Sequence, residues 1–246
     1  MIPLFLCWGS FLNVLSYRLI KKISIISPRS FCPHCRVAIA WYDNIPVFSW
    51  LALGGVCRHC KEPISILYPT IELLTLLLFS LLYFWVPTHY FIPYFIFFSA
   101  LVVTIRTDLE YMLISRLVTI FLIPLALGFS MINLLPISIF DSMLGALVGY
   151  SFLFSISFLF RLFTGKEGIG QGDLDLLAFI GSFTGIIGCW ISLLIGSTVG
   201  SFIGLGYLLL YRPQKQVKIP FGPFLVTGAI SFVLFQESLL RLLALA

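Results

Sequence analysis

The sequence predicts an all-α polytopic membrane protein with about eight transmembrane helices and a small cytoplasmic zinc-binding insertion. Hydrophobic residues make up 60% of the chain and charged residues only 10%, whereas a soluble domain has roughly a quarter of its residues charged. Several apolar runs approach the ~20 residues that a membrane-spanning helix needs. The one sizeable polar stretch holds four of the six cysteines, at a spacing typical of a zinc site.

The apolar runs divide into eight expected helices, at 2–19, 67–86, 90–106, 117–135, 143–162, 174–188, 189–211 and 221–243. The long run 174–211 is divided near Gly188. Basic residues follow the first run and do not precede it, so we interpret it as a retained helix rather than a cleaved signal peptide. It is short for a full span, which leaves open a start upstream of Met1.

The distribution of charge sets the expected topology. With the N-terminus outside, the cytoplasmic loops are 20–66, 107–116, 163–173 and 212–220, and these loops with their flanks hold almost every Lys and Arg. Arg241 alone is left outside, in agreement with the positive-inside rule. The net charge of +5 is therefore explained by the membrane, and no nucleic-acid partner is expected. No internal repeat stands out.

A cytoplasmic domain at 20–66 carries two Cys-x-x-Cys knuckles, Cys32 with Cys35 and Cys57 with Cys60. Paired knuckles match a four-thiolate zinc site, and full coordination makes such a metal structural. The cytosol disfavours disulfides, and a segment this small gains stability from a metal. The alternatives are a redox dithiol or four unrelated thiols. His34 and His59, inside the knuckles, are interpreted as flanking residues, and Cys7 and Cys189, in apolar helices, as packing residues.

Two carboxylates are the candidate catalytic residues. Asp108 follows the third expected helix and Asp173 opens the sixth, so both fall on the cytoplasmic side. Ionisable groups at the membrane are functional candidates. Two carboxylates held close do not both ionise readily, so one keeps a proton near neutral pH. One can then activate water while the other protonates the peptide carbonyl or the leaving amine, which is the chemistry of an aspartic protease.

The acids also have simpler interpretations. Asp is a favoured N-cap, and Asp173 lies where a cap would lie. Asp175 and Glu110 each follow a candidate by two residues and face another side of a helix, so we expect both to be dispensable. Glu72 is expected to pair with a cation or to line the site. Two further acids are interpreted as loop residues, Asp141 and Glu167. The absence of His-Glu-x-x-His and Gly-x-Ser-x-Gly argues against a zinc protease or a serine hydrolase.

These residues belong to a series of short motifs that runs almost from end to end. In the first part of the chain the motifs are 9–14 followed by Arg18, the two knuckles, 42–47 followed by 49–50, and 68–72. In the rest of the chain they are Asp108, 165–168, Gly-Gln-Gly-Asp at 170–173, and 219–223. On these motifs the chain resembles the bacterial type IV prepilin peptidases (prepilin leader peptidase/N-methyltransferase), which are Gly-x-Gly-Asp intramembrane aspartic proteases. The resemblance makes 67–246 the transmembrane aspartic protease domain, after a first transmembrane helix at 1–19.

The resemblance implies an enzyme of the bacterial inner membrane with its active site at the cytoplasmic face. Its substrates would be type IV prepilins and the related pseudopilins of type II secretion, cut after a glycine that precedes an apolar helix. Asp108 and Asp173 match the two family aspartates. Many members also methylate the new N-terminal residue with S-adenosylmethionine, so the chain is expected to be bifunctional. Which residues bind that cofactor is open.

Besides the abbreviated first helix, two features depart from the family pattern. An Ile/Leu-Pro-Asp triplet that often follows the first aspartate is replaced here by Ile114, Ser115 and Arg116, and a basic residue that usually follows the second aspartate is replaced by Asp175. Two rival functions remain. One is a zinc-knuckle transporter subunit or assembly scaffold, which would place polar groups near mid-membrane. The other is an enzyme specialised for methylation alone.

Overall fold

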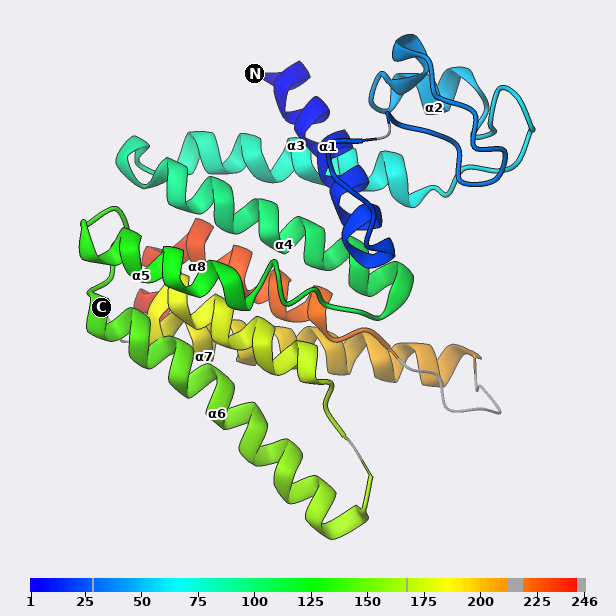
Figure 1. Cartoon of the computed structure of the whole chain (residues 1–246). Helices are drawn as coiled ribbons and strands as arrows, with labels where there is room; N and C mark the ends of the chain where they lie inside the picture. The colour runs from blue at the N-terminus through cyan, green and yellow to red at the C-terminus, as the bar shows by residue number, and fades with distance from the viewer. Residues whose placement is uncertain (28, 167, 212–218, 243–246) are drawn as a thin grey trace. The chain divides into compact units, whose positions relative to one another are not determined.

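The computed structural model describes residues 1–27, 29–166, 168–211 and 219–242. Glu167, Arg212, Lys215 and Lys218, which were assigned to loops from the sequence, lie outside the described residues. The chain forms two compact units, Met1–Val86 and Pro87–Ala246, and each is described here by itself. Within the described residues the only β pairing is two isolated bridges, so the all-α prediction is confirmed (Figure 1).

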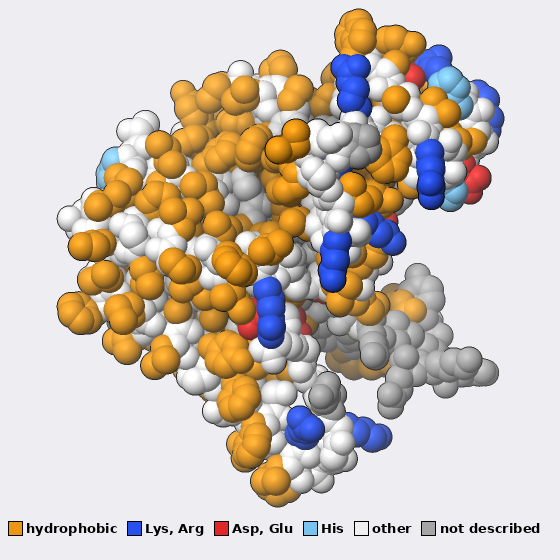
Figure 2. Space-filling model, viewed as in Figure 1, with side chains coloured by type: hydrophobic (Ala, Val, Ile, Leu, Met, Phe, Trp, Pro, Cys, Tyr) orange, Lys and Arg blue, Asp and Glu red, His pale blue; other side chains and the backbone are white. Residues whose placement is uncertain are grey.

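Six helices in the described part of the chain are long and apolar enough to cross a membrane: Ile2–Lys21, Leu67–Trp85, Thr88–Tyr111, Ile139–Thr164, Gln171–Leu210 and Gly222–Arg241. Hydrophobic side chains cover most of the face seen in Figure 2, whereas Lys and Arg gather in small separate groups. A surface of this kind is suited to lipid and not to water. The prediction of a polytopic membrane protein is therefore supported by length, composition and surface.

The first unit is built on two antiparallel helices, α1 (Ile2–Lys21) and α3 (Leu67–Trp85). The rings of Phe5 and Phe79 lie 5.9 Å apart, and the Asn13 side-chain amide donates to the carbonyl of Tyr68. A Cβ on Gly9 would lie 2.9 Å from a backbone atom of α3, so a small residue is needed at this crossing. In its described residues, the polar segment between the helices contains two short helical elements, η1 (Trp41–Asn44) and α2 (Phe48–Ala52).

The second unit contains η2 (Thr88–Tyr90), α4 (Phe91–Tyr111), η3 (Ile120–Leu122), α5 (Ile123–Met131), α6 (Ile139–Thr164), α7 (Gln171–Tyr211) and α8 (Gly222–Leu242). Helix α6 packs against the first part of α7, where Gly145 and Gly181 bring the two backbones into direct contact. The later part of α7 packs against α8, with Gly196 beside Phe224 and Gly228 beside Ser192. Small residues permit this close packing of apolar helices.

Helix α7 is interrupted at Gly185, where φ is 71° and ψ is −174°. This backbone conformation is accessible essentially only to glycine. The chain reverses here, and Figure 1 shows the two arms of α7 running in opposite directions. The predicted division of the run 174–211 is thus present, three residues before Gly188. Asp141 is not the loop residue expected: it lies in the first turn of α6, and its Oδ1 accepts the N–H of Ile186 just after the break.

The membrane-spanning helix expected at 117–135 is only about half as long in the structure. Residues 116–119 form turns, with the N–H groups of Val118 and Thr119 bonded to the carbonyl of Ser115. The α5 helix then covers only Ile123–Met131, with Pro124 in its first turn, and Asn133 adopts a left-handed conformation beyond its end. A proline is favoured at a helix start and disfavoured inside one, which is why the apolar run does not become a single helix.

Candidate active site and metal centre

Asp108 lies near the end of α4, in the most buried stretch of that helix, and is 5% exposed. One of its carboxylate oxygens, Oδ2, accepts the backbone N–H of Gly222 at 3.0 Å. Gly222 begins α8, where the first N–H groups of a helix have no partner within it. The close approach requires glycine, because a Cβ at this position would lie 2.6 Å from the same oxygen.

Asp173 lies in the first turn of α7, after the two glycines of its motif. Its backbone N–H donates to the carbonyl of Gly170 at 3.1 Å, which closes the turn that leads into the helix. The carboxylates of Asp173 and Asp108 lie close enough to interact electrostatically. The structure thus brings together the two aspartates that the sequence singled out.

Contacts between buried aromatic rings hold the two helices in this register. The ring of Phe97 on α4 lies 4.7 Å from that of Phe183 and 5.2 Å from that of Phe179, both on α7. All three rings are fully buried. Buried ring pairs at such distances add to the stability that burial itself provides. Because α4 and the first arm of α7 run antiparallel, this contact places the end of one helix beside the start of the other.

Ile114 fills the space between the two aspartate-bearing segments. A Cβ on Gly172 would lie 2.9 Å from Cβ of Ile114, and one on Gly222 would lie 3.3 Å from its Cδ1. The single isoleucine therefore packs on both glycines, one beside each aspartate. Three segments far apart in the sequence, at 108–116, 170–175 and 219–222, meet at this point.

The two departures from the family pattern are in direct contact. Arg116 donates from Nε to Oδ2 of Asp175 at 3.0 Å. Asp175 is buried, and its Oδ1 accepts a 3.3 Å bond from Gln171. The Gln171 amide also donates to the hydroxyl of Tyr150 on α6. Asp175 is a buried ion-pair partner, so the expectation that it is dispensable no longer follows from its position in the sequence.

Two other acids have structural partners. Glu110 pairs with Arg106, one turn before it on α4. Glu72 was expected to pair with a cation or to line the site, but it is buried in the first unit and accepts the N–H of Val47 at 2.8 Å. Val47 has φ of 63°, which is a strained conformation for a β-branched residue. The Glu72 carboxylate thus supports a strained turn at the start of α2.

The two cysteine knuckles have the same backbone structure. In the first knuckle, the N–H of Cys32 donates to the carbonyl of Val37, and the N–H of Arg36 donates to the carbonyl of Cys32. In the second knuckle, the N–H of Cys57 donates to the carbonyl of Glu62, and the N–H of Lys61 donates to the carbonyl of Cys57. Arg36 and Lys61 both have positive φ. Each knuckle is closed by one β-bridge. The sequence therefore contains a short repeat, 31–39 and 56–64, that sequence analysis missed because only the cysteines, the histidines and the final isoleucine are identical.

The four sulfurs converge. One ligand atom from each of Cys32, Cys35, Cys57 and Cys60 lies within 4.8 Å of the others, so the cluster could hold a metal ion. None of the four is in a disulfide. Backbone N–H groups of Cys60 and His59 lower the pKa of Cys57 to about 6, whereas burial and the neighbouring cysteines raise the pKa of Cys60 to about 11. Cys57 is therefore the member of this knuckle that most readily becomes the thiolate that a metal requires.

An ion pair connects η1 to the second knuckle. Arg58 donates to both carboxylate oxygens of Asp43, at 2.6 and 2.7 Å. The hydrogen bond from Arg58 holds the pKa of Asp43 below its ordinary value. The guanidinium also lies over the ring of Tyr42, 5.7 Å from its centroid. These contacts position the 42–47 segment next to the cysteine cluster.

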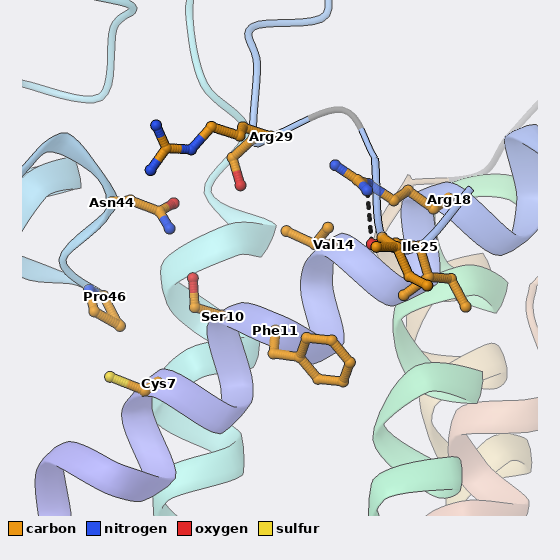
Figure 3. A pocket seen from close by; sticks show the side chains of 11 residues that line it. Cys7, Ser10, Phe11, Val14, Arg18, Ile25, Arg29, Asn44 and Pro46 are labelled. Atoms are coloured by element: carbon orange, nitrogen blue, oxygen red, sulfur yellow. Dashed lines mark hydrogen bonds between the residues drawn. The ribbon is translucent and has the colours of Figure 1, made fainter. Parts of the chain in front are cut away.

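A cavity of about 330 Å³ lies between α1 and the polar segment of the first unit. Figure 3 shows Ser10, Phe11 and Val14 of α1 on one side and Asn44 and Pro46 across from them. Two arginines complete its lining. Arg18 is buried and donates to the carbonyls of Ser24 and Ile25, whereas the side chain of Arg29 is exposed. The lining combines apolar side chains with two arginines, two serines and an asparagine, so it offers both apolar and polar contacts to a small molecule.

Comparison with known proteins agrees with this arrangement. Residues 4–86 match a family model described as the bacterial peptidase A24 N-terminal domain, and residues 95–209 match the type IV leader peptidase family. A protein of Aeromonas hydrophila named prepilin leader peptidase/N-methyltransferase is 39% identical over 89% of this chain and 75% of its own length. The chain belongs to the type IV leader peptidase family.

Other members of this family are similar over most of the chain. A Pseudomonas aeruginosa protein of the same name is 32% identical over 95% of this chain and 88% of its own length. One from Burkholderia pseudomallei is 35% identical over 87% and 69%. No solved structure matches. The family resemblance expected from the sequence motifs is therefore confirmed.

Proposed function

We propose that this chain is a membrane aspartic endopeptidase that removes the leader peptide of type IV prepilins and type II secretion pseudopilins, and then methylates the new N-terminal residue. The observation that carries the peptidase assignment is the meeting of the Asp108 and Asp173 carboxylates from two different helices. The relatives that share most of the chain are named for both activities.

Cleavage uses the two aspartates as a general acid–base pair. One oxygen of Asp108 is occupied by the N–H of Gly222, so its other oxygen holds the attacking water and takes its proton. Asp173 donates a proton to the carbonyl oxygen of the scissile peptide as the water oxygen bonds to the carbonyl carbon. Collapse of the tetrahedral intermediate returns a proton to the leaving amine and breaks the C–N bond. No covalent enzyme intermediate is needed.

The protease site faces the cytoplasm from the bacterial inner membrane, with the N-terminus of the chain outside. In the second unit, the end of α4, the end of α6 and the start of α7 lie at the aspartate end. The described cations at or near that end include Arg116, Arg161 and Lys166, whereas α8 carries Arg241 at its other end. This asymmetry supports a cytoplasmic position for the aspartates.

The cysteine cluster holds a structural Zn²⁺. Zn–S bonds of about 2.3 Å in a tetrahedron place sulfurs about 3.8 Å apart, and the sulfurs of Cys32 and Cys60 are 3.8 Å apart. Four thiolates fill the coordination sphere, so the ion has no open position for water. It belongs to a cytoplasmic domain at 20–66, between the first transmembrane helix at 1–19 and the protease domain at 67–246.

Methylation takes place in the first unit, at the cavity of Figure 3. S-adenosylmethionine, when bound, supplies a methyl group on a positively charged sulfur. The cavity volume, about 330 Å³, lies at the lower end of the range for small-molecule sites. The exposed Arg29 guanidinium suits a carboxylate, and the ring of Phe11 offers a face to an adenine or to a sulfonium. Asn44 can donate to or accept from polar groups of the cofactor.

Cleavage of a pilin precursor by purified protein in detergent or lipid tests the peptidase assignment. Asp108→Asn and Asp173→Asn are each expected to abolish cleavage while the protein still inserts and folds. Glu237→Gln is the matched control, because Glu237 is an exposed acid at the far end of α8. Processing by either aspartate variant at the wild-type rate would reject the assignment. A wild-type protein that methylates a pre-cut pilin but does not cleave the precursor would be a methyltransferase alone, and one with neither activity would favour a transporter or scaffold.

A further inference from the structure

Asp175 is a buried acid that cleavage does not use. Its side chain is only 2% exposed, yet Arg116, its partner at 3.0 Å, is 62% exposed. The other carboxylate oxygen accepts a 3.3 Å bond from Gln171. A buried charge requires pairing and hydrogen bonding to be tolerated. This pair therefore differs from exposed ion pairs such as Arg241–Glu237, in which both side chains lie mostly in solvent and contribute little.

The pair connects the two segments that carry the aspartates. Arg116 lies in the segment that follows α4, and Asp175 lies one half-turn after Asp173 on α7. Between them, Ile114 packs on Gly172. The ion pair and the apolar contact thus fix the post-α4 segment against the first turn of α7 at two neighbouring points.

The pair also affects the charge around Asp173. Asp175 would place a second negative charge two residues from Asp173 if its charge were not balanced. The Arg116 guanidinium balances it, and the Gln171 amide donates to the remaining oxygen. Asp175 itself lies near the N-terminus of α7, where the helix dipole favours a negative charge. The negative member of the pair therefore lies at the end of α7 where a negative charge is favoured.

We propose that the Arg116–Asp175 ion pair is a positioning device for cleavage: it holds the segment after α4 against the start of α7, so that Asp108 and Asp173 face one water molecule at the correct separation. This inference rests on the proposed peptidase function. Neither residue contacts the substrate or the attacking water molecule in this role. Loss of the pair allows the two segments to shift, and displacements of about 1 Å in a catalytic pair lower rates by roughly a hundredfold.

Asp175→Asn is the decisive variant, because it removes the charge while leaving an exposed arginine that water can solvate. We expect kcat for a pilin precursor to fall about tenfold or more, with KM nearly unchanged, because the alignment of the two aspartates is lost while the substrate contacts stay. Arg116→Gln should lower kcat at least as much, and Arg116→Lys should retain more activity than Arg116→Gln. Arg241→Gln, in the exposed pair, should leave both constants unchanged.

A charge reversal tests pairing directly. The double variant Arg116→Asp with Asp175→Arg restores opposite charges, and it should recover a large part of the kcat lost by Asp175→Asn. Recovery should be incomplete, because an arginine near the start of α7 opposes the helix dipole. Hydrogen–deuterium exchange of 112–119 provides a readout independent of activity: exchange should increase in Asp175→Asn and return toward wild type in the double variant.

Wild-type kcat and KM in Asp175→Asn would overturn the proposal, as would unchanged exchange of 112–119 together with a tenfold loss of kcat. The Asp108→Asn and Asp173→Asn proteins are measured in the same series. If those two remain active, the peptidase assignment fails, and the exchange result still decides whether the pair orders this segment.

Discussion

The backbone N–H of Gly222 and the carboxylate of Asp108 are 3.0 Å apart although 114 residues separate them in sequence. The bond links the start of α8 to the end of α4, and it occupies one oxygen of a proposed catalytic residue. Ile114 packs against the same glycine. The 219–223 motif therefore acts on the aspartate directly, through its main chain.

Gly222→Ala should reduce cleavage strongly, by about a hundredfold, because its Cβ would lie 2.6 Å from Oδ2 of Asp108. Either the carboxylate or the start of α8 has to move. The measurement is the rate of precursor cleavage at saturating substrate. Gly206→Ala is the control, since a methyl group added there would enter open space. Equal rates in the two variants would show that the Gly222 contact is unimportant.

Purified protein should contain about one zinc per chain, because four thiolates satisfy one tetrahedral ion. Replacing Cys32 and Cys57 together by Ser should remove it, whereas Cys7→Ser, at an exposed cysteine outside the cluster, should not. Metal analysis of the three proteins provides the measurement. A wild-type protein free of metal after purification without chelators contradicts the prediction.

Gly185→Ala should destabilise the second unit. Its φ of 71° and ψ of −174° cost a non-glycine residue on the order of 1–3 kcal/mol, and the new methyl group would collide with the Asp141 carboxylate. Thermal unfolding in detergent should show a lower midpoint than wild type. Gly206→Ala, within a regular part of the same helix, should be neutral or slightly stabilising. A Gly185→Ala protein as stable as wild type would mean that the reversal tolerates a side chain.

Methylation and cleavage should be separable, because the proposed cofactor cavity and the aspartates belong to different units. Asp173→Asn should still methylate a pre-cut pilin. Arg29→Gln should weaken binding of S-adenosylmethionine in a direct titration, and should lower methylation while precursor cleavage continues. Arg36→Gln, at an exposed arginine outside the cavity lining, is the matched control. If a folded Asp173→Asn protein that binds the pre-cut substrate transfers no labelled methyl group, the two activities share one site.

Much of this site could be predicted from sequence because its residues are rare in their surroundings. Because the chain is apolar and has few acids, Asp108 and Asp173 could be identified as functional candidates. The two Cys-x-x-Cys knuckles likewise predict a zinc site from their spacing alone. The helices followed from long apolar runs in the same way. Where an apolar run contained Pro124, hydrophobicity alone gave no indication that the helix would be only half as long as expected.

The contacts that sequence analysis missed depend on tertiary structure. Gly222 contributes a backbone N–H, and no side-chain pattern marks it as a donor. Asp175 was judged from its position beside Asp173, whereas its role depends on Arg116, which is 59 residues away. The sequence did contain a signal for this contact. Arg116 stands where the family pattern has an acid, and Asp175 stands where it has a basic residue. Complementary changes of charge at two positions indicate that the two residues are in contact. Asp141 carried no comparable signal, because its partner is the backbone of a break in α7.

The repeated knuckles have a consequence for the order in which the first unit assembles. Each is closed by its own short-range main-chain bonds, so both halves can form before any metal arrives. The proposed Zn²⁺ would then join the two preformed knuckles and close the intervening loop, which contains Asn44 and the strained Val47. Closing a loop lowers the entropy of the chain that it encloses. Metal availability would accordingly govern how well the cavity is formed, and cells short of zinc would be expected to accumulate cleaved but poorly methylated pilins.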